Sequence, residues 1–171
     1  MDELKSAIRD VPNFPKEGII FKDITPLVRD GKSFRQAIDA IAEQWAEKKI
    51  DVVVGIEARG FVFASALAYK LGIGVVMVRK PGKLPSATYS VTYDLEYGTD
   101  SLEIHQDAFQ SGQNVLIVDD VLATGGTVKA VSELLQNFDA NLLGIAFLIE
   151  LAFLNGRDKL TDLTFTTLMT Y

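Results

Sequence analysis

Apolar residues recur along the chain at two different spacings, and these spacings predict alternating helices and strands. Between residues 34 and 45 they recur every three to four positions, which is typical of a helix that buries one face. Ser33 precedes this stretch and a glutamine follows three residues later, a pattern typical of a helix N-cap. Further helices are predicted over residues 60–71, ending before Gly72, and over residues 127–137.

Continuous apolar runs lie between the helical patterns. They cover residues 51–56, 75–78, 115–118 and 142–151. A run that is apolar throughout, instead of at alternate positions, suits a strand that is covered on both faces, as in a parallel sheet. The sequence therefore predicts an α/β fold with a mainly parallel central sheet flanked by helices.

Two segments fall outside this alternation. Residues 12–26 contain prolines and glycine around the apolar run Ile19-Ile20-Phe21, and we expect a loop here, with an edge strand as the alternative. Residues 84–103 carry tyrosines, serines and threonines without a helical stripe, so we expect a mobile flap or hairpin outside the main sheet. No linker divides residues 1–171, and this length suits a single domain.

Composition and charge exclude several classes of function. The chain has 17 basic and 23 acidic residues, and its net charge of −6 argues against a nucleic-acid partner. It has no cysteine and one histidine, His105, which excludes a disulfide framework, a thiol nucleophile and a multi-histidine metal site. No apolar run approaches the ~18 residues of a membrane span, and the first ten residues lack the apolar region of a signal peptide. We therefore expect a cytoplasmic protein with no membrane partner.

The strongest chemical signal is the segment 115–127, where an apolar strand leads through small residues into a helix. Gly125 and Gly126 allow a ligand to approach the backbone closely, and consecutive N–H groups at a helix start form an anion cradle. Thr124 and Thr127 add hydroxyl donors, so the segment suits a phosphate monoester. It is not a Walker loop, because no lysine follows Gly126; a plain capped helix is the alternative.

Asp119 and Asp120 stand between this strand and the glycines. As carboxylates they accept hydrogen bonds only, which suits the vicinal hydroxyls of a ribose better than a phosphate. In an extended strand adjacent side chains face opposite ways, so we expect one of the two to contact the sugar unless the chain turns there. Strand, acids and glycine loop together suit a sugar phosphate.

A second strand-to-helix junction repeats this geometry at Glu57-Ala58-Arg59-Gly60. Arg59 supplies a cation beside the helix N-terminus and suits a second phosphate group; an ion pair with Glu57 on the surface is the alternative. Three further cations, Arg79, Lys80 and Lys83, fall within five residues after another strand. Beside two anion loops they suit the neutralisation of a diphosphate, the alternative being a solvated basic turn.

These motifs resemble a known family. Residues 115–127 are similar to the phosphoribosyl pyrophosphate (PRPP) signature of the type I phosphoribosyltransferases, and residues 14–26, 79–85, 93–98 and 118–127 together resemble the adenine-specific members. The resemblance covers nearly the whole chain. It implies a purine salvage enzyme that converts adenine and PRPP into AMP and diphosphate. It also implies a homodimer, and Mg²⁺ that arrives with PRPP and has no direct protein ligand.

The resemblance also implies a role for individual residues. By it, Ile20, Phe21 and the Lys22 backbone contact adenine, Glu96 is the candidate general acid or base, and Tyr97 belongs to the flap. Ala123 stands where hypoxanthine and guanine enzymes carry an aspartate, which favours adenine. The implied PRPP and AMP site comprises Asp119, Asp120, Ala123, Thr124, Gly125, Gly126 and Thr127, and the implied diphosphate site Arg59, Arg79, Lys80 and Lys83, some of which reach a neighbouring subunit's site.

Three alternatives stay open. Taken alone, Glu96 is a solvated loop residue. The chain could serve another purine, such as xanthine. It could also be a regulator that senses PRPP without catalysis, although such a protein would typically add a DNA-binding domain or a basic face, and this acidic chain has neither.

Overall fold

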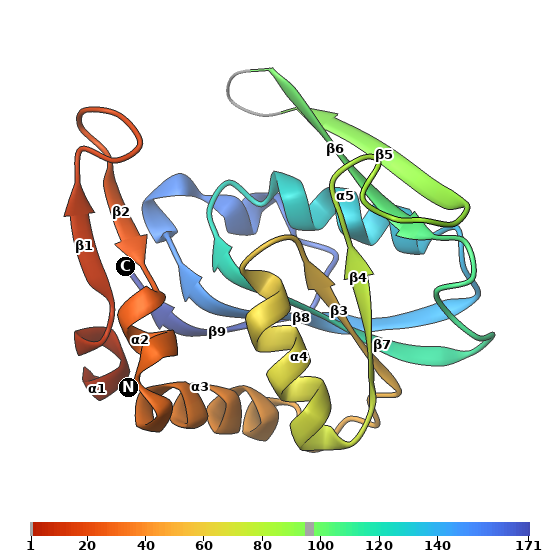
Figure 1. Cartoon of the computed structure of the whole chain (residues 1–171), viewed down its shortest axis with the longest axis horizontal. Helices are drawn as coiled ribbons and strands as arrows, with labels where there is room; N and C mark the ends of the chain where they lie inside the picture. The colour runs from red at the N-terminus through yellow and green to blue at the C-terminus, as the bar shows by residue number, and fades with distance from the viewer. Residues whose placement is uncertain (1, 95–97) are drawn as a thin grey trace.

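The computed structural model describes residues 2–94 and 98–171, and its centre is a five-stranded parallel sheet (Figure 1). The strand order is β4-β3-β7-β8-β9, and every neighbouring pair runs parallel. The strands are β3 Val52–Ile56, β4 Gly74–Val78, β7 Gln113–Leu122, β8 Ala140–Glu150 and β9 Phe165–Thr170. The predicted α/β fold with a parallel sheet is confirmed.

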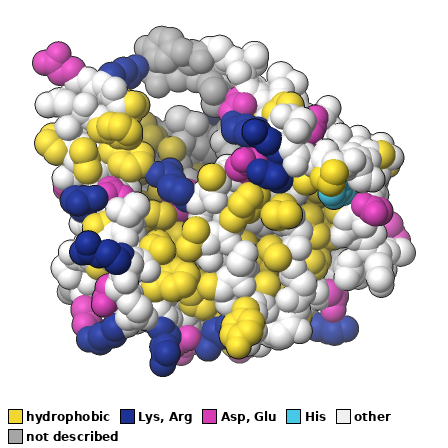
Figure 2. Space-filling model, viewed as in Figure 1, with side chains coloured by type: hydrophobic (Ala, Val, Ile, Leu, Met, Phe, Trp, Pro, Cys, Tyr) yellow, Lys and Arg dark blue, Asp and Glu magenta, His cyan; other side chains and the backbone are white. Residues whose placement is uncertain are grey.

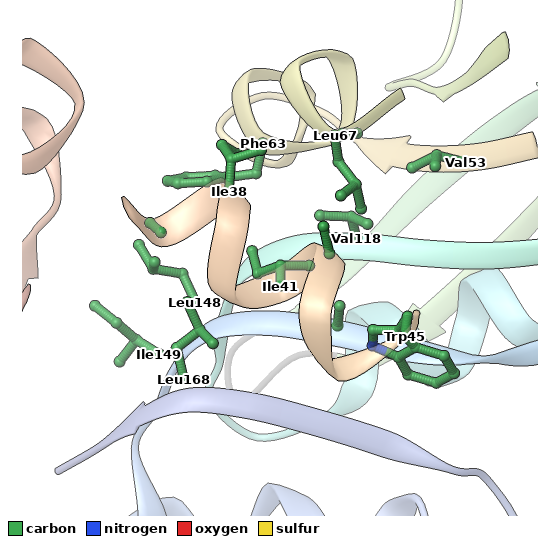
Figure 3. Close-up of a cluster of buried hydrophobic side chains, with 14 of the residues drawn as sticks. Ile38, Ile41, Trp45, Val53, Phe63, Leu67, Val118, Leu148, Ile149 and Leu168 are labelled. Carbon is green, nitrogen blue, oxygen red and sulfur yellow. The ribbon is translucent and has the colours of Figure 1, made fainter. Parts of the chain in front are cut away.

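Helices cover both faces of the sheet. One face packs against α3 Gly31–Gln44 and α4 Gly60–Leu71, whose inward side chains form one core cluster with β3, β7 and β8 (Figure 3). The other face packs against α5 Gly126–Leu135. Helices α4 and α5 each begin just after the carboxyl end of a strand, β3 and β7, where ligands of such folds bind.

Helix boundaries follow the predicted patterns with one correction at α3. This helix begins at Gly31, and its N-cap is Asp30, not Ser33. The Asp30 carboxylate accepts hydrogen bonds from the Ser33 backbone N–H at 2.8 Å and from its hydroxyl at 2.6 Å, so Ser33 is the residue that the cap serves. Gly72 ends α4 in a left-handed conformation, φ 68°, as predicted.

The residues predicted as a loop around the Ile19-Ile20-Phe21 run instead form an antiparallel hairpin. Its strands are β1 Arg9–Pro12 and β2 Ile20–Asp23, between the short helices α1 Asp2–Ser6 and α2 Thr25–Arg29. The strand alternative was therefore right, but the hairpin does not bury its apolar tip, since Ile20 is 55% exposed. The turn residues Asn13 and Gly18, both with positive φ, close the hairpin.

A second hairpin stands outside the main sheet, as predicted. It consists of β5 Thr88–Asp94 and β6 Thr99–His105. Leu102 and Ile104 anchor its base in the core cluster under α5. Two short 3₁₀ turns, η1 Ala152–Leu154 and η2 Gly156–Lys159, connect β8 to β9. Within the described residues, every helix is too short or too polar to cross a membrane.

Candidate active site

The two predicted anion loops lie side by side at the carboxyl edge of the sheet. β3 and β7 are parallel neighbours with Gly55 paired to Val118, so the loop after β3 runs beside the acids that end β7. A Cβ on Gly60 would lie 2.8 Å from an Asp119 carboxylate oxygen and 3.0 Å from the Val118 carbonyl oxygen. Gly60 therefore permits this close approach, a requirement that becomes visible only once the two strands are paired. The Glu57-Ala58 peptide in this loop is cis.

The loop at residues 123–125 bends between β7 and α5 and encloses a small pocket. Gly125 stands at the helix start with φ 77°, a conformation that favours glycine. The free N–H groups of the first turn of α5 suit an anion at this point. The pocket is lined by Asp119, Val121, Leu122, Ala123, Thr124, Gly125, Thr127, Val128 and Phe147. The predicted phosphate loop thus has both a hollow and hydrogen-bond donors.

Asp119 and Asp120 face opposite ways, because β7 stays extended through Leu122. Asp119 lines the pocket. Asp120 is 5% exposed and lies against Arg59, whose Nε is 2.7 Å from its Oδ2. The two groups form an ion pair, but their geometry is not that of a hydrogen bond. Among the described residues, the buried Asp120 Oδ2 therefore accepts no hydrogen bond. The alternative prediction, an ion pair between Arg59 and Glu57, is therefore wrong.

The site does not accommodate Asp119 and Asp120 well when both carboxylates are charged. Burial raises the pKa of Asp119 well above its usual value, and the neighbouring Asp120 carboxylate raises it further, although part of Asp119 still faces the pocket. Burial also raises the pKa of Asp120, against the opposing effect of the Arg59 cation. A ligand that donates hydrogen bonds to Asp119 would relieve this cost, which fits a sugar with free hydroxyls.

The basic turn after β4 is held by carboxylates of the loop after β3 and of β6. Glu57 accepts hydrogen bonds from two guanidinium nitrogens of Arg79, each at 3.3 Å, and from the Lys80 backbone N–H at 2.8 Å. The Lys80 ammonium group pairs with the carboxylate of Asp100 on β6. Lys83 keeps an exposed side chain, and its carbonyl oxygen accepts from Arg79 at 3.1 Å. The turn is therefore paired with carboxylates, in contrast to the solvated alternative.

The first hairpin brings an aromatic face to the Arg59 loop. The Arg59 guanidinium lies 5.1 Å from the centroid of the Phe21 ring, and Phe14 packs edge-on against the same ring at 5.2 Å. The side chain of Lys22 is engaged elsewhere, with Asp10 at 2.7 Å and over the ring of Tyr171 at 4.1 Å. The structure thus places Arg59 over the ring of Phe21. Of Lys22, only the backbone is available to a base.

The second hairpin reaches the phosphate loop from the opposite side. The Tyr93 hydroxyl lies 3.3 Å from the Thr127 hydroxyl and 3.4 Å from an Asp100 carboxylate oxygen. Glu96 and Tyr97 lie outside the described residues, between the ends of β5 and β6. Sequence reasoning missed Asp100, because a polar residue in a strand carries no signature until the topology places it beside a cation.

Known proteins resemble the whole chain. Residues 28–163 match the phosphoribosyl transferase domain family. A Geobacter metallireducens protein named adenine phosphoribosyltransferase is 60% identical over 171 residues, 100% of both chains. The crystal structure of adenine phosphoribosyltransferase from Thermoanaerobacter pseudethanolicus is 51% identical with a TM-score of 0.96, covering 99% of each chain. A Saccharomyces cerevisiae adenine phosphoribosyltransferase, complexed with an imino-altritol bisphosphate and adenine, is 48% identical with a TM-score of 0.91, covering 97% of this chain and 96% of that one. The chain therefore belongs to the phosphoribosyltransferase family and, within it, groups with the adenine phosphoribosyltransferases.

Proposed function

We propose that the protein transfers the phosphoribosyl group of PRPP to adenine in purine salvage, giving AMP and diphosphate. One observation carries this proposal. The pairing of β3 with β7 brings a small pocket and Asp119 beside the loop of Arg59, and the first hairpin adds the aromatic face of Phe21. These groups suit, in turn, the phosphate, the ribose, the leaving group and the base. The relatives named adenine phosphoribosyltransferase support the same reaction, and we expect it in the cytoplasm.

The chemistry is a substitution at the anomeric carbon of the ribose. Adenine N9 forms the new C–N bond, and diphosphate leaves with the electron pair of the broken C–O bond. By analogy with glycosyl transfer, positive charge develops on the sugar in the transition state. The protein acts by positioning and by electrostatic stabilisation. We assign the ribose hydroxyls to Asp119, whereas Asp120 holds Arg59 in place.

The leaving diphosphate requires cations. Arg59 lies in the loop after β3. Arg79 and Lys80 are connected to the same loop by their contacts with Glu57. We propose that these residues, with the exposed Lys83, turn toward the diphosphate in their own site or in that of a second subunit. We further propose that the β5–β6 hairpin closes over the bound substrates, since its Tyr93 already contacts Thr127. Closure would exclude water that would otherwise hydrolyse the activated sugar.

Magnesium is implied by the family, and the donor set fits a metal held mainly by the substrate. No group of three or more His, Cys, Asp or Glu that could hold a metal occurs in the described residues. At the pocket, Asp119 is the available carboxylate, because Asp120 is paired with Arg59. Mg²⁺ favours phosphate oxygens and water over an all-protein cage. When bound with PRPP it would neutralise phosphate charge, and we propose no direct protein ligand.

We propose that the protein is a homodimer joined through α4 and the edge strand β4. This face carries exposed large apolar side chains, Val62, Tyr69, Leu71, Val75 and Met77, and Tyr69 is 91% exposed (Figure 2). Contiguous apolar surface on an edge strand is uncommon in a monomer. Sedimentation equilibrium should give twice 18.8 kDa. Met77→Glu should shift the mass toward the monomer, whereas Phe153→Glu, an exposed apolar control in η1, should not. A monomeric parent protein would contradict the proposal.

Adenine should be preferred over 6-oxopurines by at least about 100-fold in kcat/KM, the scale reached when mismatched polar groups stay unpaired. The reason is Ala123, which offers no side-chain acid or base to a 6-oxopurine. The test mixes the protein with Mg²⁺, PRPP and each purine in turn, and measures the nucleotide formed by chromatography. Equal or faster product from hypoxanthine, guanine or xanthine would contradict the assignment. Absence of nucleotide with every purine would favour a regulator that senses PRPP.

A further inference from the structure

The turn that follows β8, the neighbour of β7, packs against the loop at residues 123–125. Asn155, with φ 52°, redirects the chain into η2, whose first residue Gly156 is buried. A Cβ on Gly156 would overlap the carbonyl oxygen of Ala123 and would lie 3.0 Å from a methyl carbon of Leu122. A Cβ on Gly125 would lie 2.6 Å from the Gly156 carbonyl oxygen. The two backbones are therefore in direct contact, with no room for a side chain on either.

An ion pair fixes the position of this turn. Glu150 ends β8 and is 1% exposed, and it pairs in register with Leu122, the last residue of β7. Arg157 of η2 donates to both Glu150 carboxylate oxygens, through Nε and through a terminal guanidinium nitrogen at 2.6 Å. A buried carboxylate is costly unless it is paired and hydrogen-bonded. Glu150 therefore holds Arg157, and with it Gly156, at a fixed place relative to the end of β7.

An aromatic contact connects the same arginine with the pocket wall. The Arg157 guanidinium lies 5.1 Å from the centroid of the Phe165 ring on β9. Phe165 in turn packs edge-on against Phe147, with the ring centroids 6.3 Å apart. Phe147 lines the phosphate pocket. Arg157 thus supports both the loop, through Gly156, and the opposite side of the pocket, through two rings.

We propose that Gly156, held by the Glu150–Arg157 pair, is a positioning element for the phosphate loop. Its residues do not contact the ligand. They set the path of residues 123–125, whose N–H groups must point at the 5′-phosphate of PRPP and AMP. Such donors act only within a fraction of an ångström of their productive place. This inference rests on the proposed function, since it concerns the affinity of that same site for a phosphate group.

The direct test is Gly156→Ala. Gly156 does not have a positive φ, so alanine accepts its backbone conformation and the new methyl group acts by pushing against the Ala123 carbonyl and the Leu122 side chain. Competition experiments measure the affinities for AMP and for adenosine, which differ only in the 5′-phosphate. We expect the ratio of the two affinities to fall about 10–100-fold, the cost of roughly 1 Å of misplacement, with adenosine binding nearly unchanged. Gly31→Ala is the matched control, because a Cβ there meets no atom within 4 Å.

A second variant keeps the test decisive if the new methyl group prevents folding. Glu150→Gln preserves the size of the side chain but removes the charge that holds Arg157, and it should lower the same ratio by about threefold to tenfold. A folded Gly156→Ala variant with the parent ratio would overturn the inference, as would a parent ratio in Glu150→Gln when Gly156→Ala does not fold. A parent protein that binds AMP no more tightly than adenosine and forms no AMP would instead overturn the proposed function.

Discussion

Replacement of Glu96 by glutamine is expected to lower turnover by about 10²–10⁴-fold, the usual contribution of general acid–base catalysis. Glutamine keeps the size and the hydrogen bonding of Glu96 but cannot exchange a proton at neutral pH. The motivation is the place of Glu96 in the family motif at residues 93–98 and the absence of any acid at Ala123. Affinity for PRPP should be nearly preserved, because we assign the sugar phosphate to the β7–α5 loop and to Arg59, not to Glu96. Single-turnover rates measure the chemical step directly.

Glu96→Ala separates the remaining explanations. If Glu96 only holds the hairpin closed, Gln should restore much of the activity that Ala loses. If it is a solvated loop residue, neither variant should change the rate. Glu43→Gln, on the exposed side of α3, controls for the loss of one negative charge. A Glu96→Gln rate within about threefold of the parent, against the general-base expectation, would remove Glu96 from the chemistry and leave positioning as the main catalytic device.

Asp119→Asn should make the ligand-free protein more stable against unfolding and should impair its use of PRPP. Loss of the charged acceptor should raise the KM for PRPP by about 10–100-fold, the range of hydrogen bonds to charged groups. At the same time the variant no longer confines two carboxylates beside each other, which should raise the free energy of unfolding at pH 7 by about 1 kcal/mol. That gain corresponds to a melting temperature about 2–4 °C higher. Calorimetry and initial-rate kinetics on the same preparation measure both effects.

The stability gain should depend on pH with a definite sign. The pKa of Asp119 is raised by burial, so the folded protein binds its proton more tightly than the unfolded chain does. A carboxyl with a raised pKa contributes stability below its unfolded pKa, near 3.8, and that contribution is lost as the pH rises through the folded value. The difference in melting temperature between Asp119→Asn and the parent should therefore be small near pH 4 and should grow toward pH 8. Asp162→Asn, at an exposed turn, should show no such growth.

A stability difference that stays flat between these pH values would show that the Asp119 carboxylate is well solvated in the ligand-free state. Normal PRPP kinetics in Asp119→Asn would place the ribose on Asp120 instead. The two readouts are independent, so that each assignment can fail alone.

The parallel sheet could be predicted because each of its inner strands contains a continuous apolar run. The strand Val52–Ile56 was predicted one residue too long at its start, and the helix Gly60–Leu71 with both ends, since a helix-ending glycine follows it. Strand β9 was missed because threonines fill half of its six positions, so that no apolar run marks it. The first hairpin was interpreted as a loop because prolines and glycine dominate that stretch, yet these residues form its turn.

The sequence predicted the two loops that the structure brings together, but not how their charges pair. Local spacing offered Glu57 as the alternative partner of Arg59, whereas the adjacency of β3 and β7 gives Arg59 to Asp120 and leaves Glu57 to Arg79. Such pairings depend on which strands are neighbours, and strand order is a long-range property. The contact of Gly156 with the phosphate loop is of the same kind, because thirty residues lie between it and Gly125.

The pairing of the site's cations has a consequence for what the cleft attracts. Arg59, Arg79 and Lys80 each already have a carboxylate partner, so the cleft offers little uncompensated positive charge to solution. A polyanion that lacks the shape of PRPP therefore gains little by entering, because it must displace Asp120, Glu57 or Asp100 without making the contacts that repay the exchange. We infer that these three carboxylates act as internal competitors. On this inference, binding depends on a ligand that engages both anion loops at once.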